Sequence, residues 1–189
     1  GLYKLGDFPA KKFRTWNGHF RDDIRRFWKG DKSTIWPLKD RLIGNKSLYN
    51  DNNLANIFSE IKKDLNNNNL EILITDDVNL KARPTSLKRS FENIIINGLT
   101  YGKKVFVELI KGNNRAIIIF EDDGPGIPED QFKNVLKPFF RLDKSRSLNK
   151  SGVGLGLALV EDIINSHGGN IQLGKSRYDG LQVKVTLPF

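Results

Sequence analysis

The chain has 189 residues, no cysteine and a formal net charge of +9 at pH 7. Without cysteine it has no disulfide framework and no thiolate metal site, and no apolar run reaches the roughly 20 residues that a transmembrane helix needs. Methionine is also absent, including at position 1, so we expect a soluble fragment or a processed chain.

The positive charge is concentrated at the start of the chain. Residues 1–50 contain 12 Lys and Arg against 5 Asp, and all three tryptophans, whereas residues 51–189 contain 19 basic and 17 acidic residues. This step in composition predicts a basic, tryptophan-containing segment of uncertain fold over residues 1–50 and a domain over residues 51–189. A basic chain suggests nucleic-acid binding, but the second part is nearly neutral, so we rank nucleic acid last among the partners.

Helical spacing of apolar residues occurs early in the chain. In the first segment it is confined to residues 19–30, where we expect one short helix docked on a neighbouring domain. A helix lying on a membrane surface is the less favoured alternative. The second part opens with a helical pattern over residues 51–65, and a short strand pattern follows over residues 71–75. A longer helix is predicted over residues 84–101, where Pro84 suits the first turn.

The rest of the chain alternates hairpins and helices. Short runs of alternating or continuous apolar residues, separated by turn signals such as KGNN, predict strands. In chain order we expect strands at 105–110 and 115–121, a brief helix at 129–136, a helix at 153–167, and strands at 171–174 and 180–187. This pattern predicts the α+β class: a two-layer α/β sandwich with a mixed sheet and helices on one face.

The helix at 84–101 carries a polar stripe. Asn93, Asn97 and Tyr101 are spaced by four residues, so they line one helical face. The stripe could simply face solvent, since the chain has 19 asparagines. Alternatively, the amide oxygens could join phosphate oxygens around Mg²⁺, which accepts hard oxygen ligands and needs few of them from the protein.

A second cluster, EDDGPGIP, follows the most apolar strand pattern in the chain. It could be an ordinary surface turn. However, Asp122 would lie at the edge of the core, where a carboxylate requires hydrogen-bond donors, and the exocyclic amine of adenine is such a donor. Gly124 and Gly126 would permit a close approach of the backbone that side chains would block.

A third cluster, SGVGLGLALV, introduces the helix at 153–167. Gly152, Gly154 and Gly156 alternate with larger residues, and exposed amides at a helix N-terminus bind anions. A flexible hinge is the simpler alternative. The spacing is neither GxGxxG after a strand nor GxxxxGK[ST], so the dinucleotide-binding and P-loop readings both fail.

Taken in this order, the clusters resemble the ATP-binding catalytic domain of sensor histidine kinases, in the gyrase-like ATPase superfamily with its Bergerat-type fold. RSFENIIINGLTYG resembles the N box, EDDGPGIP the G1 box, KPFFRLD the F box and SGVGLGLALVEDIINSHGG the G2 box. The resemblance runs from about Asp51 to Phe189 and is most similar to the osmolarity-sensor, EnvZ type.

The resemblance implies that ATP and Mg²⁺ are the cofactors. Asn97 would bind Mg²⁺, with Asn93 near the phosphates and a possible second metal ligand, and Asp122 would accept from the adenine amine. The other implied nucleotide-binding positions are Tyr101, Gly124, Gly126, Phe139, Arg141, Lys144, Gly152, Gly154, Leu155, Gly156 and Leu157. Residues 137–152 would form an ATP lid, in which Arg141 and Lys144 assist charge neutralisation or simply belong to a solvated loop. No residue is identified as catalytic.

The same resemblance implies phosphoryl transfer. Hydrolysing relatives carry a water-activating glutamate where this chain has Asn93, so we expect transfer of the γ-phosphoryl group to a histidine on a dimerisation domain. The implied partners are that acceptor domain, a response regulator and, in the full-length protein, a second copy. The domain would be cytoplasmic and its parent anchored in the inner membrane.

The acceptor histidine itself is not recognisable. His19 is followed by phenylalanine rather than a carboxylate and no Thr-Pro-Leu follows, so we do not expect it to be the acceptor. The alternative function is therefore a degenerate or split kinase that binds ATP without transferring phosphate. His167 is expected to cap the end of its helix, and Gly98, where the family usually has alanine, to weaken the helix at 84–101 without touching the ligands.

Overall fold

The computed structural model describes residues 50–138, 140 and 156–189, and these all belong to one compact unit. The predicted helix at residues 19–30 and His19 lie outside the described residues, and the domain boundary near residue 50 stays a prediction. Among the helices described, none is long and apolar enough to cross a membrane.

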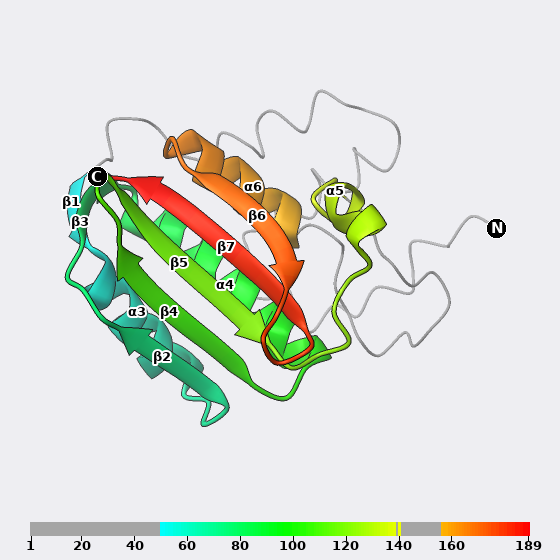
Figure 1. The fold of residues 1–189 in the computed structure, drawn as a ribbon. Coiled ribbons are helices and arrows are strands. Elements are labelled where there is room, and N and C mark those ends of the chain that lie inside the picture. Colours follow the sequence, from blue (N-terminus) through cyan, green and yellow to red (C-terminus); the bar gives the residue numbers. More distant parts are fainter. Residues whose placement is uncertain (1–49, 139, 141–155) are drawn as a thin grey trace, which may run out of the picture. The chain divides into compact units, whose positions relative to one another are not determined.

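A five-stranded mixed sheet forms one layer of the domain (Figure 1). From edge to edge its strands are β2 (Leu70–Ile74), β4 (Val105–Lys111), β5 (Arg115–Asp122), β7 (Leu181–Pro188) and β6 (Asn170–Lys175). The β2–β4 pair is parallel and the other pairs are antiparallel. The predicted hairpins and the mixed sheet are therefore confirmed.

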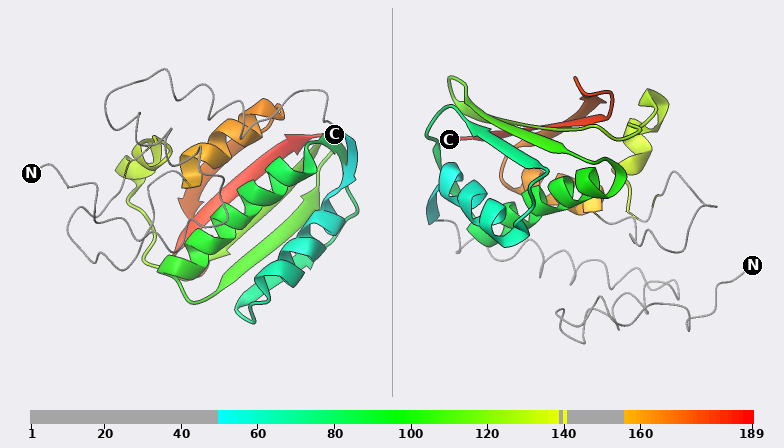
Figure 2. Two further views of the ribbon diagram at one scale, coloured as in Figure 1. Left: turned by 180° about the vertical axis from the view of Figure 1, so that it is seen from behind. Right: turned by 90° about the horizontal axis from the view of Figure 1, so that it is seen from below.

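The three longest described helices form the second layer and lie on one face of the sheet, as predicted (Figure 2). They are α3 (Leu54–Leu65), α4 (Pro84–Tyr101) and α6 (Gly156–Ser166). The core between the layers includes three buried rings: Phe58 stacks on Phe91 at 5.0 Å between centroids, and Phe91 lies 5.7 Å from Phe120. Because these rings come from α3, α4 and β5, they fix α4 across the middle of the sheet.

One local expectation was wrong, and one ribbon of strands was not predicted. The helix expected at 51–65 begins at Leu54, because the side chain of Asn53 caps it by accepting from the amides of Ala55 and Asn56. The residues before it form β1 (Asn50–Asn53), which pairs with β3 (Asn79–Ala82) in a separate ribbon. The sequence NDNN gave no strand signal, because asparagine and aspartate are depleted in strands.

The brief helix expected at 129–136 is present in a mixed form. A single 3₁₀ turn, η3 (Glu129–Gln131), leads into α5 (Phe132–Val135). Neither element buries a residue fully. The EDDGPGIP segment is therefore followed by a short helical connection that lies outside the main core.

His167 joins the end of α6 to the start of α4. Its Nδ1 lies 2.7 Å from the carbonyl oxygen of Ile163, in the last turns of α6, which agrees with the predicted capping role. Its Nε2 accepts from the backbone N–H of Arg83, the N-cap residue of α4, at 3.1 Å. Because Nε2 is an acceptor, the buried ring must be neutral with its proton on Nδ1.

This geometry predicts a loss of stability in mild acid. Burial lowers the pKa of His167; the hydrogen bond to Ile163 opposes this and the charge of Arg83 adds to it. Since the folded-state pKa lies below the unfolded value of about 6.5, the stabilisation is complete above that pH and is lost as the pH falls through the folded-state pKa. We expect the melting temperature to fall between pH 7.5 and 5.5.

The substitution His167→Gln provides the comparison, because glutamine does not titrate. At pH 7.5 the variant should be less stable, by about 1–3 kcal/mol if a buried hydrogen bond is lost. Its melting temperature should then change less than that of the original chain between the two pH values. Equal changes in both proteins would show that His167 is not the titrating group.

Candidate functional site

The Asp122 carboxylate, at the last residue of β5, is held by backbone amides. Its Oδ1 accepts from the N–H of Gly124 at 2.9 Å and from the N–H of Leu181 at 3.1 Å. Burial raises the pKa of Asp122, these two hydrogen bonds oppose the rise, and the neighbouring charge of Asp123 adds to it. Among the described residues, both hydrogen bonds of this carboxylate end on Oδ1.

Glycines bring three chain segments against Asp122. A Cβ atom added at Gly98 in α4 would lie 2.5 Å from Val105 Cγ2 and 3.3 Å from Asp122 Cβ. One added at Gly124 would lie 2.9 Å from Asp122 Oδ1, and one at Gly180 would lie 2.1 Å from the same oxygen. The expectation that Gly98 stands apart from the ligand-binding positions was therefore wrong, because it lies directly against Asp122.

The rest of the EDDGPGIP segment is tied to the same elements. Gly126 has φ +69°, which favours glycine, and it lies against the backbone of Gly180. Asp123 Oδ1 accepts from the N–H groups of Lys103 and Lys104 at 2.6 and 2.8 Å, and these bonds lower the pKa of Asp123. The segment is thus fixed to the end of α4 on one side and to the β6–β7 connection on the other.

The polar face of α4 meets the start of α6. Asn93 and Asn97 are half-buried, and Tyr101 is 55% exposed at the end of the helix. A Cβ atom added at Gly156 would lie 3.2 Å from Asn97 Nδ2, so the first turn of α6, with the half-buried Leu157, adjoins this amide. Asn97 adjoins the start of α6 and the next residue, Gly98, adjoins Asp122, so the three predicted clusters meet at one part of α4.

Some predicted site residues cannot be placed. Phe139, Arg141, Lys144, Gly152, Gly154 and Leu155 lie outside the described residues, as does most of the expected ATP lid at residues 137–152. Conversely, the structure adds Gly98, Gly180 and Leu181 to the surroundings of Asp122. The DG pair at Asp179 and Gly180 is an ordinary hairpin-turn signal, and nothing local in the sequence links it to Asp122, 58 residues earlier.

The donor set at this site is suited to Mg²⁺. The side-chain oxygens of Asn93 and Asn97 are hard, neutral ligands of the kind that Mg²⁺ accepts alongside phosphate oxygens and water. Within the described ranges, no group of three or more His, Asp or Glu side chains is placed to hold a metal by itself. A cation at this position would therefore depend on oxygens of a bound phosphate ligand.

The contact between Gly156 and Asn97 yields a test. In the variant Gly156→Ala, the added methyl carbon would lie only 3.2 Å from Asn97 Nδ2. Because this is shorter than an ordinary van der Waals contact, the Asn97 amide would be displaced. We expect about a tenfold loss of Mg²⁺–ATP affinity by calorimetry, the effect of roughly 1.4 kcal/mol. The matched control is Gly174→Ala in β6, where the nearest atom would lie 3.5 Å away. Equal affinities in the two variants would argue against a role for Asn97.

Comparisons with known proteins agree with this geometry. Residues 82–189 match the family described as histidine kinase-, DNA gyrase B-, and HSP90-like ATPase. The sensor histidine kinase GtrS of Pseudomonas aeruginosa is 37% identical over 107 residues, which are 57% of this chain and 22% of GtrS. The sensor histidine kinase CpxA of Escherichia coli is 34% identical over 110 residues, which are 58% of this chain and 24% of CpxA. The chain thus spans about a quarter of the length of these curated relatives.

Comparison with solved structures also finds similar histidine kinase domains. The histidine kinase domain of the E. coli osmosensor EnvZ is 33% identical, with a TM-score of 0.59, and the match covers 77% of this chain and 91% of that domain. The mycobacterial sensor histidine kinase MprB has a TM-score of 0.64 at 22% identity, covering 74% of this chain and 97% of that structure, and supports the fold alone. Because the family match spans more than half of the residues, this chain belongs to the histidine kinase-, DNA gyrase B- and HSP90-like ATPase family and contains a histidine-kinase ATP-binding catalytic domain.

Proposed function

We propose that this domain binds Mg²⁺–ATP beside the C-terminal half of α4 and transfers the γ-phosphoryl group to a histidine on a separate acceptor domain. The observation that carries the proposal is the meeting of three elements at Asn97 and Gly98. There the amide face of α4, the carboxylate at the end of β5 and the first turn of α6 adjoin one another. The carboxylate would bind the base, the amide face of α4 the Mg²⁺ ion, and the first turn of α6 the phosphates.

Asp122 is the proposed receptor for the adenine base. Its Oδ1 is already engaged by two backbone amides, and Oδ2 faces Gly98, where a Cβ atom would be 3.6 Å away. An ionised Oδ2 accepts the exocyclic amine of adenine, whereas a purine with a carbonyl at that position would place oxygen against oxygen. Gly98 and Gly124 keep the backbone close without filling the space beside the carboxylate.

Asn97, assisted by Asn93, is the proposed holder of Mg²⁺. Bound Mg²⁺ would neutralise charge on the triphosphate oxygens, and the protein contributes mainly position and electrostatics to phosphoryl transfer. The N-terminal turn of α6 faces the same region through Gly156, and the partial positive charge of a helix N-terminus favours phosphate there. Arg141, Lys144 and the glycines before Gly156 remain proposed contacts of the phosphates.

The surroundings of Glu92 favour transfer over hydrolysis. Asn93 cannot act as a base, and on a helix Glu92 projects about 100° away from it. Burial raises the pKa of Glu92, and the charges that act on it are those of Lys88, Asp64 and Arg89. Lys88 in turn bridges to α3 through Glu60 and Asp64, so Glu92 belongs to the α3 side of the helix rather than to the nucleotide side.

The partners of the proposed reaction follow from the kind of relatives that match. GtrS and CpxA are sensor histidine kinases, and we propose for this chain an acceptor-histidine domain, a response regulator, a dimeric parent and a membrane anchor in that parent. The alternative of a degenerate remnant is not favoured, because the family match runs through residues 82–189 without loss of the N-box amides or of Asp122.

Base recognition is tested by Asp122→Asn. The asparagine oxygen can still accept from Gly124 and Leu181, but its NH₂ group then meets the adenine amine, donor against donor. We expect ATP affinity by calorimetry to fall at least about tenfold, since an unpaired buried polar group costs 1–3 kcal/mol. The control is Asp130→Asn, an exposed carboxylate whose described partner is the neighbouring Gln131. Similar ATP affinities for both variants would refute the assignment of Asp122.

Phosphoryl transfer is tested with γ-labelled ATP, Mg²⁺ and a purified helical-hairpin acceptor domain from a sensor histidine kinase. The original chain should give an acid-labile label on the acceptor, and Asn97→Ala should lose nearly all of it because the metal is no longer held. Release of free phosphate with no labelled acceptor, under conditions where calorimetry shows bound ATP, would contradict transfer.

A further inference from the structure

Glu121 is a buried carboxylate next to the proposed base receptor, but on the other side of the sheet. Successive side chains of a strand point to opposite faces, so Asp122 borders the helical layer while Glu121 lies on the outer face. There Glu121 stands between Phe106 of β4 and Gln182 of β7 in the strand register, and it is only 2% exposed. A carboxylate in that position requires strong partners.

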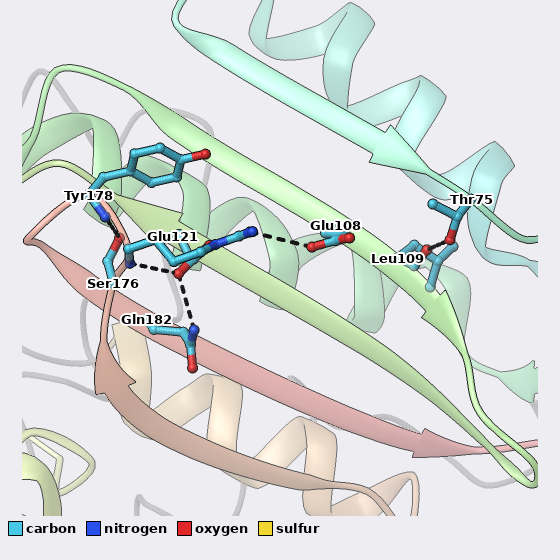
Figure 3. A network of polar contacts seen from close by, with 8 residues as sticks. Thr75, Glu108, Leu109, Glu121, Ser176, Tyr178 and Gln182 are labelled. Carbon is cyan, nitrogen blue, oxygen red and sulfur yellow. Dashed lines mark hydrogen bonds and ion pairs between the residues drawn. The ribbon is translucent and has the colours of Figure 1, made fainter.

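The partners of Glu121 come mostly from the turn between β6 and β7 (Figure 3). Its Oε1 accepts from the backbone N–H of Arg177 at 2.9 Å and from Gln182 Nε2 at 3.1 Å, and its Oε2 accepts from Arg177 Nε at 2.6 Å. Burial alone would raise the pKa of Glu121, but these hydrogen bonds outweigh it and hold the pKa below its ordinary value. Glu121 is therefore an ionised anchor for Arg177.

Residues 176–180, here called the β6–β7 turn, form a closed unit. The N–H of Ser176 donates to the carbonyl of Gly180 at 3.0 Å, and the N–H of Tyr178 donates to the Ser176 hydroxyl at 3.0 Å. The Tyr178 ring stacks on Phe106 with 4.0 Å between centroids. The turn is thus attached to the outer face of the sheet at two points, the carboxylate of Glu121 and the ring of Phe106.

The opposite end of this turn contacts Asp122. Gly180 lies so close that a Cβ atom would be 2.1 Å from Asp122 Oδ1, and the N–H of the following Leu181 donates to that oxygen at 3.1 Å. Two consecutive residues of β5 therefore bind the two ends of one turn. Glu121 accepts hydrogen bonds from Arg177, and Asp122 accepts one from Leu181, the residue that follows the turn. A shift of the turn at Arg177 would alter the donor that occupies Oδ1.

We propose that Glu121 and Arg177 are positioning residues for base recognition: their ion pair fixes the β6–β7 turn so that Leu181 occupies Oδ1 and Oδ2 is presented to the adenine amine. The inference rests on the proposed role of Asp122. It assigns to the pair the discrimination between purines that carry an amine and purines that carry a carbonyl.

If the Glu121–Arg177 pair served stability alone, its loss would affect nucleotide binding in a different way. The Arg177 side chain is 63% exposed, but its partner Glu121 is buried, so Arg177→Gln leaves that carboxylate without this cation. Removing one partner of an ion pair whose other member is buried costs stability, although the backbone N–H of residue 177 and Gln182 Nε2 still donate to Glu121. Loss of stability alone would lower the ATP and ITP affinities together, whereas loss of positioning should lower the affinity for ATP selectively.

The experiment measures Mg²⁺–ATP and Mg²⁺–ITP affinities by calorimetry, with melting temperature in parallel. ITP carries a carbonyl where ATP carries the amine. The variants are Arg177→Gln, Glu121→Gln and the conservative Arg177→Lys. The matched control is Lys175→Gln, which removes an exposed ion pair with Asp179 at the same turn.

The original chain should prefer ATP. Arg177→Gln and Glu121→Gln should weaken ATP binding about fivefold, a typical effect of a residue that acts through a neighbour, and leave ITP binding unchanged. Arg177→Lys should give an intermediate ATP-to-ITP ratio, and Lys175→Gln the original ratio. Melting temperatures should fall in Arg177→Gln, because Glu121 stays buried without its cation, and fall less in Arg177→Lys.

Failure of the inference is distinguishable from failure of the proposed function. If the original chain binds neither nucleotide, or binds both equally, the role of Asp122 is wrong. If the original chain prefers ATP and the ratio persists in Arg177→Gln and Glu121→Gln, the positioning role is overturned while the proposed function stands. An equal loss of both nucleotides with a lowered melting temperature would likewise overturn it, because the pair would then serve stability alone.

Discussion

The close approach of α4 to the end of β5 is the constraint on which the site depends. Gly98 lies at this contact, and a Cβ atom there would be 2.5 Å from Val105 Cγ2 and 3.3 Å from Asp122 Cβ, so a larger residue would require Val105 to move. The Phe58, Phe91 and Phe120 rings hold the two elements together from within the core. Without this approach, the amide face of α4 and the carboxylate of β5 would belong to separate surfaces rather than to one proposed nucleotide site.

At that contact, neighbouring residues of α4 adjoin different parts of the proposed site. Asn97 adjoins the first turn of α6, where we propose that phosphate binds, and Gly98 adjoins Asp122, where we propose that the base is received. On this proposal, adjacent residues of α4 serve the metal and the base. We infer that the outer face of the sheet contributes through the β6–β7 turn, because Glu121 accepts from Arg177 and Asp122 accepts from Leu181, at the opposite ends of that turn.

The sequence predicted the elements with strong periodicity and the clusters with distinctive chemistry. Helix α4 has its expected bounds, and the mixed sheet with helices on one face was expected from the interleaved pattern. The β1–β3 ribbon was missed because NDNN lacks strand-forming residues. Gly180 and Leu181 were missed for another reason. They contact Asp122 on the neighbouring strand, and the DG signal predicts a turn whether or not such a contact exists.

The central claim is that one nucleotide touches Asn97, Gly98 and Asp122 together. It is tested most directly by nuclear magnetic resonance on the ¹⁵N-labelled chain titrated with Mg²⁺ and a non-hydrolysable ATP analogue. The account predicts that the largest chemical-shift changes fall on the Asn97 side-chain amide and on the backbone amides of Gly98, Gly124 and Leu181. Changes confined to other regions, with these four signals unmoved at saturation, would contradict it.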